Sequence, residues 1–264
     1  MNRQPIGMFD SGVGGLTVFS EIVKELPNED IIYLGDTRNF PYGSKSKESI
    51  IELSKKCVEF LISKNVKLII IACGTATSQS LEILQQIYSV PIIGIIEPTI
   101  YSLKQEENNI KSIGVIATQG TIKSNAWEKC ILENLKNVKV YNKACSLLAP
   151  MAEEGWVNNE VAYYTIKEYM RDFNNIDKLI LGCTHYPLFK DLIQRELGEK
   201  VDIINTGEKL AIYLKNYLAE NNMQNDDKFN ANYDLLLTDT ECNFVNVANK
   251  LLQNNITSIK KVNL

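Results

Sequence analysis

Two cysteines stand where the chain could hold a pair of reactive thiols. Cys73 and Cys183 each end a short apolar segment and precede a polar, glycine-bearing turn, and each is followed within two positions by a threonine, Thr75 or Thr184. The start of a helix stabilises negative charge, so this position favours a thiolate over a thiol of ordinary pKa ~8.5. Two thiols on opposite sides of a bound molecule could invert a carbon centre, because one can take a proton from the carbon while the other delivers a proton to the opposite face.

The other four cysteines have no polar companions in the sequence and are expected to pack in the core or on the surface. No Cys-x-x-Cys pair occurs, which argues against a zinc ribbon and against a disulfide framework. A disulfide between Cys73 and Cys183 remains as a redox alternative. The four cysteines expected to pack are Cys57, Cys130, Cys145 and Cys242.

A single histidine, His185, excludes every metal site or proton relay that needs two imidazoles. It lies two positions after Cys183, which suits acid and base chemistry beside that thiol, although it could also cap the helix that follows. Asp10 ends an apolar segment near the N-terminus and could orient Cys73 in the same way.

Four short polar segments, each containing glycine, follow predicted strands. Ligands of open α/β sheets bind outside the carboxyl ends of the strands, so these segments are the expected site. The glycines of the first segment would let backbone N–H groups approach an anion at the start of the next helix. Ser11 and Tyr42 could serve the site or be ordinary turn residues. The four segments are residues 10–15, 35–43, 73–77 and 182–187.

The first of these segments imitates a dinucleotide-binding turn but lacks its fingerprint. A Gly-x-Gly-x-x-Gly motif that begins at Gly12 would place its last glycine at position 17, which is Thr17. No Gly-x-x-x-x-Gly-Lys-Ser/Thr phosphate loop occurs either. A nucleotide-dependent oxidoreductase is therefore the least favoured function, and we expect no cofactor.

Short apolar runs alternate with longer amphipathic segments along most of the chain. The alternation predicts strands buried between helices, which is typical of a doubly wound parallel sheet. The predicted strands are residues 6–9, 31–34, 68–72, 113–117, 138–141 and 179–181, and the predicted helices are residues 16–26, 46–63, 79–88, 124–135, 161–173 and 188–197.

Two halves of this pattern resemble each other. Gly7 and Gly114 lie 107 positions apart in matching strands, and Cys73 and Cys183 lie 110 positions apart. Chance likeness of apolar strands is the alternative, but both strands that end in cysteine continue to threonine within two positions. We therefore predict an α/β protein of two pseudo-symmetric doubly wound parallel-sheet units that face each other across an active-site cleft.

The repeat also predicts where the units begin and end. The second unit is expected to cover residues 98–206, and the first unit residues 1–97 with a helix-rich returning segment, residues 207–264. That segment should contain one further strand, residues 233–237, and a surface loop at residues 220–232.

The composition of the 264-residue chain is that of an ordinary globular protein, with 45% hydrophobic residues and a formal net charge of -4. The charge comes without a basic stripe, so nucleic acid is not an expected partner. Neither a signal-peptide h-region nor a run of ~18 apolar residues occurs, so we expect no membrane partner and a cytoplasmic location with reduced thiols.

At these segments the sequence resembles the glutamate racemases of the cofactor-independent aspartate/glutamate racemase superfamily, and the resemblance covers essentially the whole chain. Four motifs in order carry it. They are Phe-Asp-Ser-Gly-Val-Gly-Gly-Leu at residues 9–16, Gly-Asp-Thr with Pro-Tyr-Gly at residues 35–37 and 41–43, Cys-x-Thr-Ala at residues 73–76, and Gly-Cys-Thr-His-Tyr-Pro-Leu at residues 182–188.

The resemblance implies interconversion of L- and D-glutamate without a cofactor, to supply D-glutamate for peptidoglycan, by a homodimer. It implies that Cys73 acts on the D-enantiomer with help from Asp10, and that Cys183 acts on the L-enantiomer. His185 and Glu153 are implied to assist Cys183. The implied substrate contacts are Asp10, Ser11, Tyr42, Gly43, Gly74, Thr75, Thr184 and His185.

Two departures from the family pattern are visible. Family members usually have asparagine at the position of Gly74, and an Ala-Arg-Val type sequence is frequent where this chain has Arg38-Asn39-Phe40. A lost hydrogen bond to a charged ligand costs ~1.5–3 kcal/mol, which would weaken binding about tenfold or more. A racemase of another acidic amino acid such as aspartate, or a catalytically weak amino-acid-binding protein, is therefore the alternative.

Overall fold

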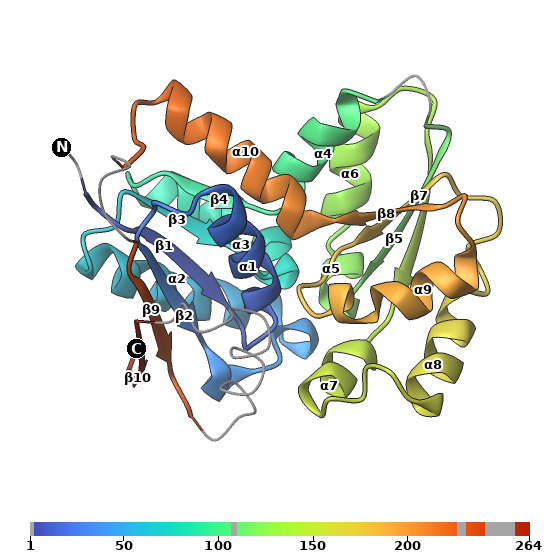
Figure 1. Ribbon diagram of the computed structural model, residues 1–264, viewed down its shortest axis with the longest axis horizontal. Coiled ribbons are helices and arrows are strands. Elements are labelled where there is room, and N and C mark those ends of the chain that lie inside the picture. Colours follow the sequence, from blue (N-terminus) through green and yellow to red (C-terminus); the bar gives the residue numbers. More distant parts are fainter. Residues whose placement is uncertain (1–2, 107–109, 226–230, 241–256) are drawn as a thin grey trace.

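The computed structural model describes residues 3–106, 110–225, 231–240 and 257–264. Its strands form two parallel sheets that lie beside each other, each packed against helices (Figure 1). The predicted α/β class and its two parallel-sheet units are thereby confirmed. Within the described ranges, the helices are all too short or too polar to cross a bilayer.

The first sheet has six parallel strands in the order β10-β9-β2-β1-β3-β4. In β1, Ile6 pairs with Ile31 on one side and with Leu68 on the other. Every residue of β1 and β3 is buried, as expected for apolar strands covered on both faces. The strands are β1 (Ile6–Asp10), β2 (Ile31–Gly35), β3 (Leu68–Ile71), β4 (Ile92–Gly94), β9 (Tyr233–Leu237) and β10 (Ser258–Lys261).

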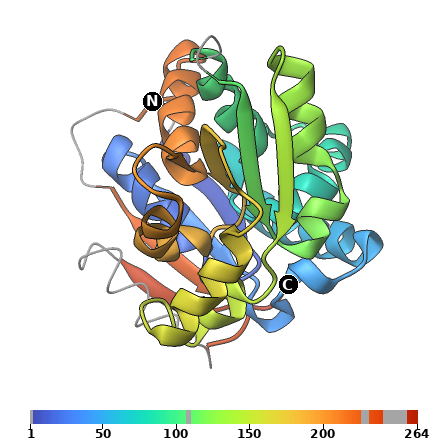
Figure 2. The same cartoon turned by 90° about the vertical axis from the view of Figure 1, so that its right-hand side faces the viewer.

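The second sheet has four parallel strands in the order β6-β5-β7-β8 and is turned toward the viewer in Figure 2. The order repeats that of β2-β1-β3-β4 in the first sheet. β5 and β7 are therefore the counterparts of β1 and β3, in agreement with the internal repeat of the sequence. The strands are β5 (Ser112–Ala117), β6 (Lys139–Ala144), β7 (Lys178–Leu181) and β8 (Asp202–Asn205).

Helices follow most of the strands, and α10 packs against both α1 and α4. The proposed division at residues 98 and 206 falls inside α4 and at the start of α10, and it stays a prediction. The helices are α1 (Gly15–Glu25), α2 (Lys47–Ser63), α3 (Gly74–Ile87), α4 (Ile96–Lys104), α5 (Gln119–Lys123), α6 (Ala126–Asn134), α7 (Leu148–Glu153), α8 (Glu160–Met170), α9 (Lys190–Leu197) and α10 (Thr206–Glu220).

Two differences from the predicted elements have local causes. The helix expected at residues 124–135 begins later, because Asn125 has a left-handed backbone with φ 55° and separates α5 from α6. The helix expected at residues 188–197 begins as a 3-10 turn, Tyr186–Phe189, with proline in its first turn. In both places the periodic pattern of apolar residues runs through a change in backbone geometry, so the pattern alone does not reveal where the helix begins.

The returning segment contains two described strands where one was predicted. β9 agrees with the prediction, whereas β10 was missed because it is a mostly exposed edge strand with no apolar run. Of the predicted loop at residues 220–232, residues 226–230 lie outside the described ranges, as do residues 241–256 of the segment predicted to be helix-rich.

A lysine lies at the start of the third strand of each unit, at the end of the sheet opposite the predicted site. Lys67 and Lys178 occupy equivalent places in the repeat. Lys67 Nζ lies 2.5 Å from Glu29 Oε2, and both side chains are buried. Lys178 Nζ lies 2.7 Å from carboxylates of Glu106 and Asp202, which are partly exposed. The first pair is therefore the one that must be desolvated for the chain to fold.

Replacing Lys67 with methionine should lower the free energy of unfolding by about 3–5 kcal/mol, because Glu29 would remain as an uncompensated charge in the interior. Equilibrium unfolding in urea measures the change. Lys55→Met is the matched control, since Lys55 pairs with Glu52 on the surface of α2, where an ion pair contributes only ~0–1 kcal/mol. Equal losses in the two variants would contradict the prediction.

Candidate active site

Most of the predicted site residues line one small cavity between the two units. Its volume is about 20 Å³, space for roughly one water molecule, so the structure is a closed arrangement that must open to admit a larger molecule. Asp10 and Glu153 do not line it. The predicted residues that do are Ser11, Tyr42, Gly43, Cys73, Gly74, Thr75, Cys183, Thr184 and His185.

The first thiol, Cys73, caps the start of α3. Its sulfur accepts a hydrogen bond from the Ala76 N–H at 3.5 Å and donates one to Ser11 Oγ at 3.6 Å. Burial and the neighbouring carboxyl of Asp10 raise the pKa of Cys73 to about 12. The N–H of Ala76 at the start of the helix lowers the pKa of Cys73, as expected, but burial and Asp10 outweigh this effect in the closed site. Cys73 is a neutral thiol here, which makes it a proton donor.

The second thiol belongs to a cluster of Cys183, His185 and Glu153, called here the Cys183 cluster. Cys183 Sγ lies 3.8 Å from His185 Nδ1, and His185 Nε2 lies 2.7 Å from Glu153 Oε1. Burial lowers the pKa of His185, but the hydrogen bonds to Cys183 and Glu153 outweigh burial and raise it to about 10. A protonated imidazole therefore stands beside Cys183 at neutral pH, whereas Cys73 faces a carboxyl group.

The imidazole of His185 should stay protonated well above neutral pH, with a titration midpoint near 10. His185 is the only histidine, so its ring proton gives one unambiguous signal in NMR of the untagged protein. Glu153→Gln should move the midpoint down toward 6.5, because the amide carries no charge. Glu154→Gln, next along the chain and exposed, is the control. A wild-type midpoint near 6.5 would contradict the prediction.

Asp10 links the two units from beneath the cavity. It is fully buried, and its Oδ1 accepts a hydrogen bond from Thr184 Oγ1 of the second unit at 3.1 Å. Ser11 Oγ donates to its other oxygen at 3.5 Å. Burial raises the pKa of Asp10, while the positive charge of His185 lowers it. Asp10 therefore touches both halves of the site.

The glycine turn before α1 receives side chains from around the cleft. A Cβ atom on Gly14 would lie 2.5 Å from atoms of His185 and Thr184, and one on Gly12 would lie 2.8 Å from the ring of Phe40. The sequence predicted an approach of these glycines to an anion. In the structure their lack of side chains makes room for the imidazole and for Phe40.

Tyr42 is held by a carboxylate of the predicted segment 35–43 that was not itself named as a site residue. Its hydroxyl donates to Asp36 Oδ2 at 2.6 Å and lies 4.0 Å from Cys57 Sγ. Asp36 is fully buried and also accepts from Thr238 Oγ1 at 2.9 Å. Its place directly after β2 was the available signal. Because the hydroxyl of Tyr42 is bound to Asp36, we expect a bound molecule to contact the backbone of Tyr42 rather than its hydroxyl.

Two threonines of α5 and its cap were also missed. Thr75 Oγ1 lies 2.8 Å from Thr118 Oγ1 and 3.2 Å from Thr121 Oγ1, and Thr118 lines the cavity. Thr118 follows β5 as Ser11 follows β1, 107 positions earlier. The internal repeat that placed the two thiols could therefore have pointed to Thr118 as well.

Gly74 and Gly182 bring the two thiols' backbones into contact. A Cβ atom on Gly74 would lie 2.3 Å from the carbonyl oxygen of Gly182, which is a severe steric clash with the backbone. Gly74 follows Cys73 and Gly182 precedes Cys183. The absence of a side chain at residue 74 therefore sets how closely the two sides of the site approach.

The remaining cysteines take no visible part in the site. The described cysteines are all free thiols, including Cys73 and Cys183, and Cys242 lies outside the described residues. Cys57 and Cys145 are buried and Cys130 is half-buried, as the packing prediction requires. Among the residues that the structure describes, no cluster of three or more His, Cys, Asp or Glu could hold a metal ion.

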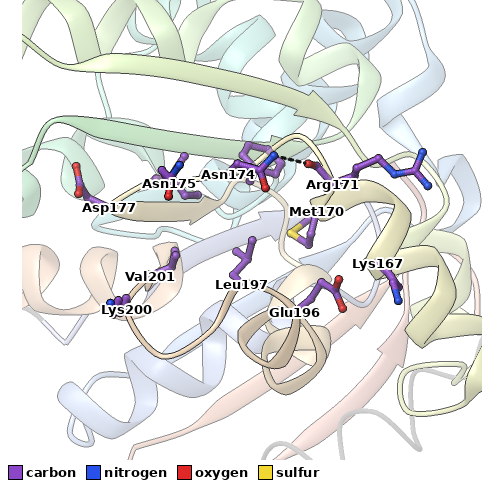
Figure 3. Close-up of a pocket in the computed structure, with 12 residues that line it drawn as sticks. Lys167, Met170, Arg171, Asn174, Asn175, Asp177, Glu196, Leu197, Lys200 and Val201 are labelled. Carbon is purple, nitrogen blue, oxygen red and sulfur yellow. Dashed lines mark hydrogen bonds between the residues drawn. The ribbon is translucent and has the colours of Figure 1, made fainter.

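A larger depression, of about 910 Å³, lies at the other end of the second sheet, near the starts of β7 and β8 (Figure 3). It contains none of the predicted site residues. Its wall carries charges of both signs, with Lys167 and Arg171 from the end of α8 and Glu196 from α9. Size alone therefore does not identify the reactive site.

The fold and the site together define a class of protein. It has two α/β units whose strands follow the same order, and a polar cavity lined by two thiols lies at the ends of those strands. Residues 6–211 match the model of the Asp/Glu/Hydantoin racemase family. A glutamate racemase from Geobacter metallireducens is 40% identical over 100% of this chain and 98% of its own length.

Solved structures agree over the full length. A glutamate racemase from Bacillus anthracis superimposes with a TM-score of 0.93 at 38% identity, covering 99% of this chain and 98% of the other. One from Francisella tularensis, solved in complex with D-glutamate, gives 0.92 at 38% identity, covering 100% and 98%. The chain belongs to the Asp/Glu/hydantoin racemase family and is an amino-acid racemase, an isomerase.

Proposed function

We propose that this protein interconverts L- and D-glutamate, with Cys73 and Cys183 as the two acid/base groups. The observation that supports this most is the shared cavity. Both thiols line it, one from each unit, and each has its own partners for a proton. Two groups with separate partners can take opposite roles in one reaction.

In the direction from L to D, Cys183 as a thiolate takes the proton from the α-carbon and becomes a thiol. Cys73 gives its thiol proton to the opposite face of the same carbon and becomes a thiolate. The substrate loses one proton and gains one, so its proton count does not change. In the reverse direction the two thiols exchange roles. The negative charge that develops on the substrate needs donors already in place, and Thr75 lines the cavity.

The partners of each thiol would assist it differently. The protonated His185, held by Glu153, would stabilise negative charge on Cys183, and Asp10 would assist Cys73 through the shared contact with Ser11. The substrate contacts in this proposal are Asp10, Ser11, Tyr42, Gly43, Gly74, Thr75, Thr184 and His185, with Thr118 added from its place in the cavity.

Glutamate is the proposed substrate because the relatives that match over the full chain carry that name, and one was solved with D-glutamate bound at 38% identity to this chain. The same proposal includes a reaction without a cofactor, supply of D-glutamate for peptidoglycan, a cytoplasmic location and a homodimer. Each of these follows from the family likeness of the chain.

Incubation with L-glutamate and separately with D-glutamate in deuterated buffer tests the proposal. NMR follows the α-proton, and chiral chromatography follows the enantiomers. Loss of the α-proton with convergence on equal enantiomers from both sides is the expected result. Exchange of aspartate or another acidic amino acid without exchange of glutamate would assign a different substrate. Binding of glutamate with no exchange would indicate a binding protein.

A further inference from the structure

Phe40 reaches from the first unit onto the histidine of the second. Its ring centroid lies 5.7 Å from that of His185, with an angle of 52° between the rings. The same ring packs against the hydrophobic core cluster of the second unit and lines the cavity. It also lies against Gly12, where a Cβ atom would come within 2.8 Å of it. Phe40 is therefore enclosed between the glycine turn and the imidazole.

The loop that carries Phe40 is fixed on both sides by one buried carboxylate. Asn39 Nδ2 donates to the oxygens of Asp36 at 3.0 and 3.1 Å, and the hydroxyl of Tyr42 donates to Asp36 at 2.6 Å. Thr238 Oγ1 donates to the same carboxylate. The residues before and after the Phe40-Pro41 pair are thus tied to the end of β2, so the ring of Phe40 is presented in a set position.

An apolar ring that covers one side of an imidazole keeps water away from it and so strengthens the hydrogen bonds that the imidazole makes. Hydrogen bonds and charge interactions are stronger where water is excluded, because the local dielectric is lower. The charged and titratable groups that face His185 are Cys183, Glu153 and Asp10. All three act on it more strongly when water is kept out.

We propose that Phe40 is a positioning residue for the Cys183 cluster: it covers the imidazole of His185, excludes water from its bonds and holds Nδ1 toward Cys183. The proposal rests on the proposed function, in which Cys183 is one of two bases. Cys73 donates a hydrogen bond to Ser11 Oγ and accepts one from the Ala76 N–H, and neither residue belongs to the Cys183 cluster, so the cover acts on one thiol rather than on both.

A graded series of variants, Phe40→Leu, Phe40→Val and Phe40→Ala, tests the proposal through the NMR titration of the single histidine. As the cover shrinks, water screens Glu153 and Cys183, which lowers the midpoint, and it also relieves the burial of the imidazole, which raises the midpoint. Because the hydrogen bonds outweigh burial in the covered site, the net change should be a stepwise fall from near 10 toward the ordinary 6.5. Phe40→Leu should stay close to wild type. If Phe40→Ala does not fold, Phe40→Val decides.

Activity provides a second readout. Phe40→Ala should lower kcat about tenfold and leave KM within about twofold, because the Cys183 cluster is displaced while the substrate contacts outside that cluster remain. Phe40→Leu should restore most of kcat. Leu192→Ala is the matched control, since Leu192 on α9 is also half-buried against the same core cluster. It should change neither the midpoint nor kcat.

Three results would overturn the proposal. They are a Phe40→Ala midpoint equal to that of wild type, a Phe40→Leu variant as impaired as Phe40→Ala, and an equal shift in Leu192→Ala. The titration needs no substrate, so it decides the role of Phe40 even if the wild-type protein fails to racemise glutamate. Failure of the proposed function would instead be seen in the exchange experiment on the wild type.

Discussion

Serine in place of Cys73 or of Cys183 should lower kcat for racemisation by about 10²–10⁴-fold, the contribution of a positioned acid or base. A hydroxyl is far too weak an acid and base at neutral pH to replace a thiol in either role. Loss of one group stops both directions, because each direction needs one thiol to take a proton and the other to give one. Chiral chromatography from L- and from D-glutamate measures both rates.

Exchange of the α-proton should separate the two variants. Cys73→Ser keeps Cys183 and should still wash deuterium into L-glutamate without forming the D-enantiomer, and Cys183→Ser should do the reverse. Cys130→Ser is the control, because Cys130 is half-buried on α6 and lies outside the cavity lining. Racemisation at the wild-type rate in both site variants would show that the two thiols are not the acid and base.

The sequence was sufficient to place the thiols because parallel strands bring their carboxyl ends to one edge. Cys73 and Cys183 each follow the third strand of a unit, and the two units share one strand order. The repeat placed each thiol at the carboxyl edge of its own sheet, and the structure shows that both thiols line one cavity. The same argument predicts that residues just after the strands, such as Ser11 and Thr184, lie at the site.

The surroundings of each thiol could not be predicted from spacing. The pKa of Cys73 is set by burial and Asp10, which raise it, against the hydrogen bond from the Ala76 N–H, which lowers it. The extent of burial is known only from the folded structure. Glu153 lies 32 positions before His185, at the end of α7, so only the family resemblance suggested their pairing. Phe40 carries no reactive group, and nothing in its neighbours along the chain indicates a contact with His185.

Many of the contacts at the site cross between the two units. Asp10 binds Thr184, Thr75 binds Thr118, and Phe40 lies on His185. A site built this way is complete only when the units are together, and the closed cavity is too small for an amino acid. An amino acid can therefore enter only if the two units move apart, which separates these pairs. We expect the spacing of the units around the substrate to control the rate of the reaction.

Gly74 offers a direct test of that spacing. Asparagine at residue 74, usual in the family, would add a hydrogen-bond donor for the substrate, but its Cβ would lie 2.3 Å from the Gly182 carbonyl oxygen. The start of α3 and the end of β7 would have to separate. A misplacement of ~1 Å costs on the order of 10²-fold in rate. We therefore expect Gly74→Asn to lower kcat about 10–100-fold rather than to improve the enzyme.

Gly74→Ala separates the two effects, because alanine adds the same Cβ without a donor. If spacing dominates, both variants lose kcat to a similar degree, whatever happens to KM, since both push the thiols apart. If the missing donor dominates, Gly74→Asn raises kcat/KM while Gly74→Ala does not, and the closed spacing is not what limits the reaction. Steady-state kinetics in both directions distinguish these results. The first would mean that glycine at residue 74 belongs to a site whose two sides pack more closely than an asparagine allows.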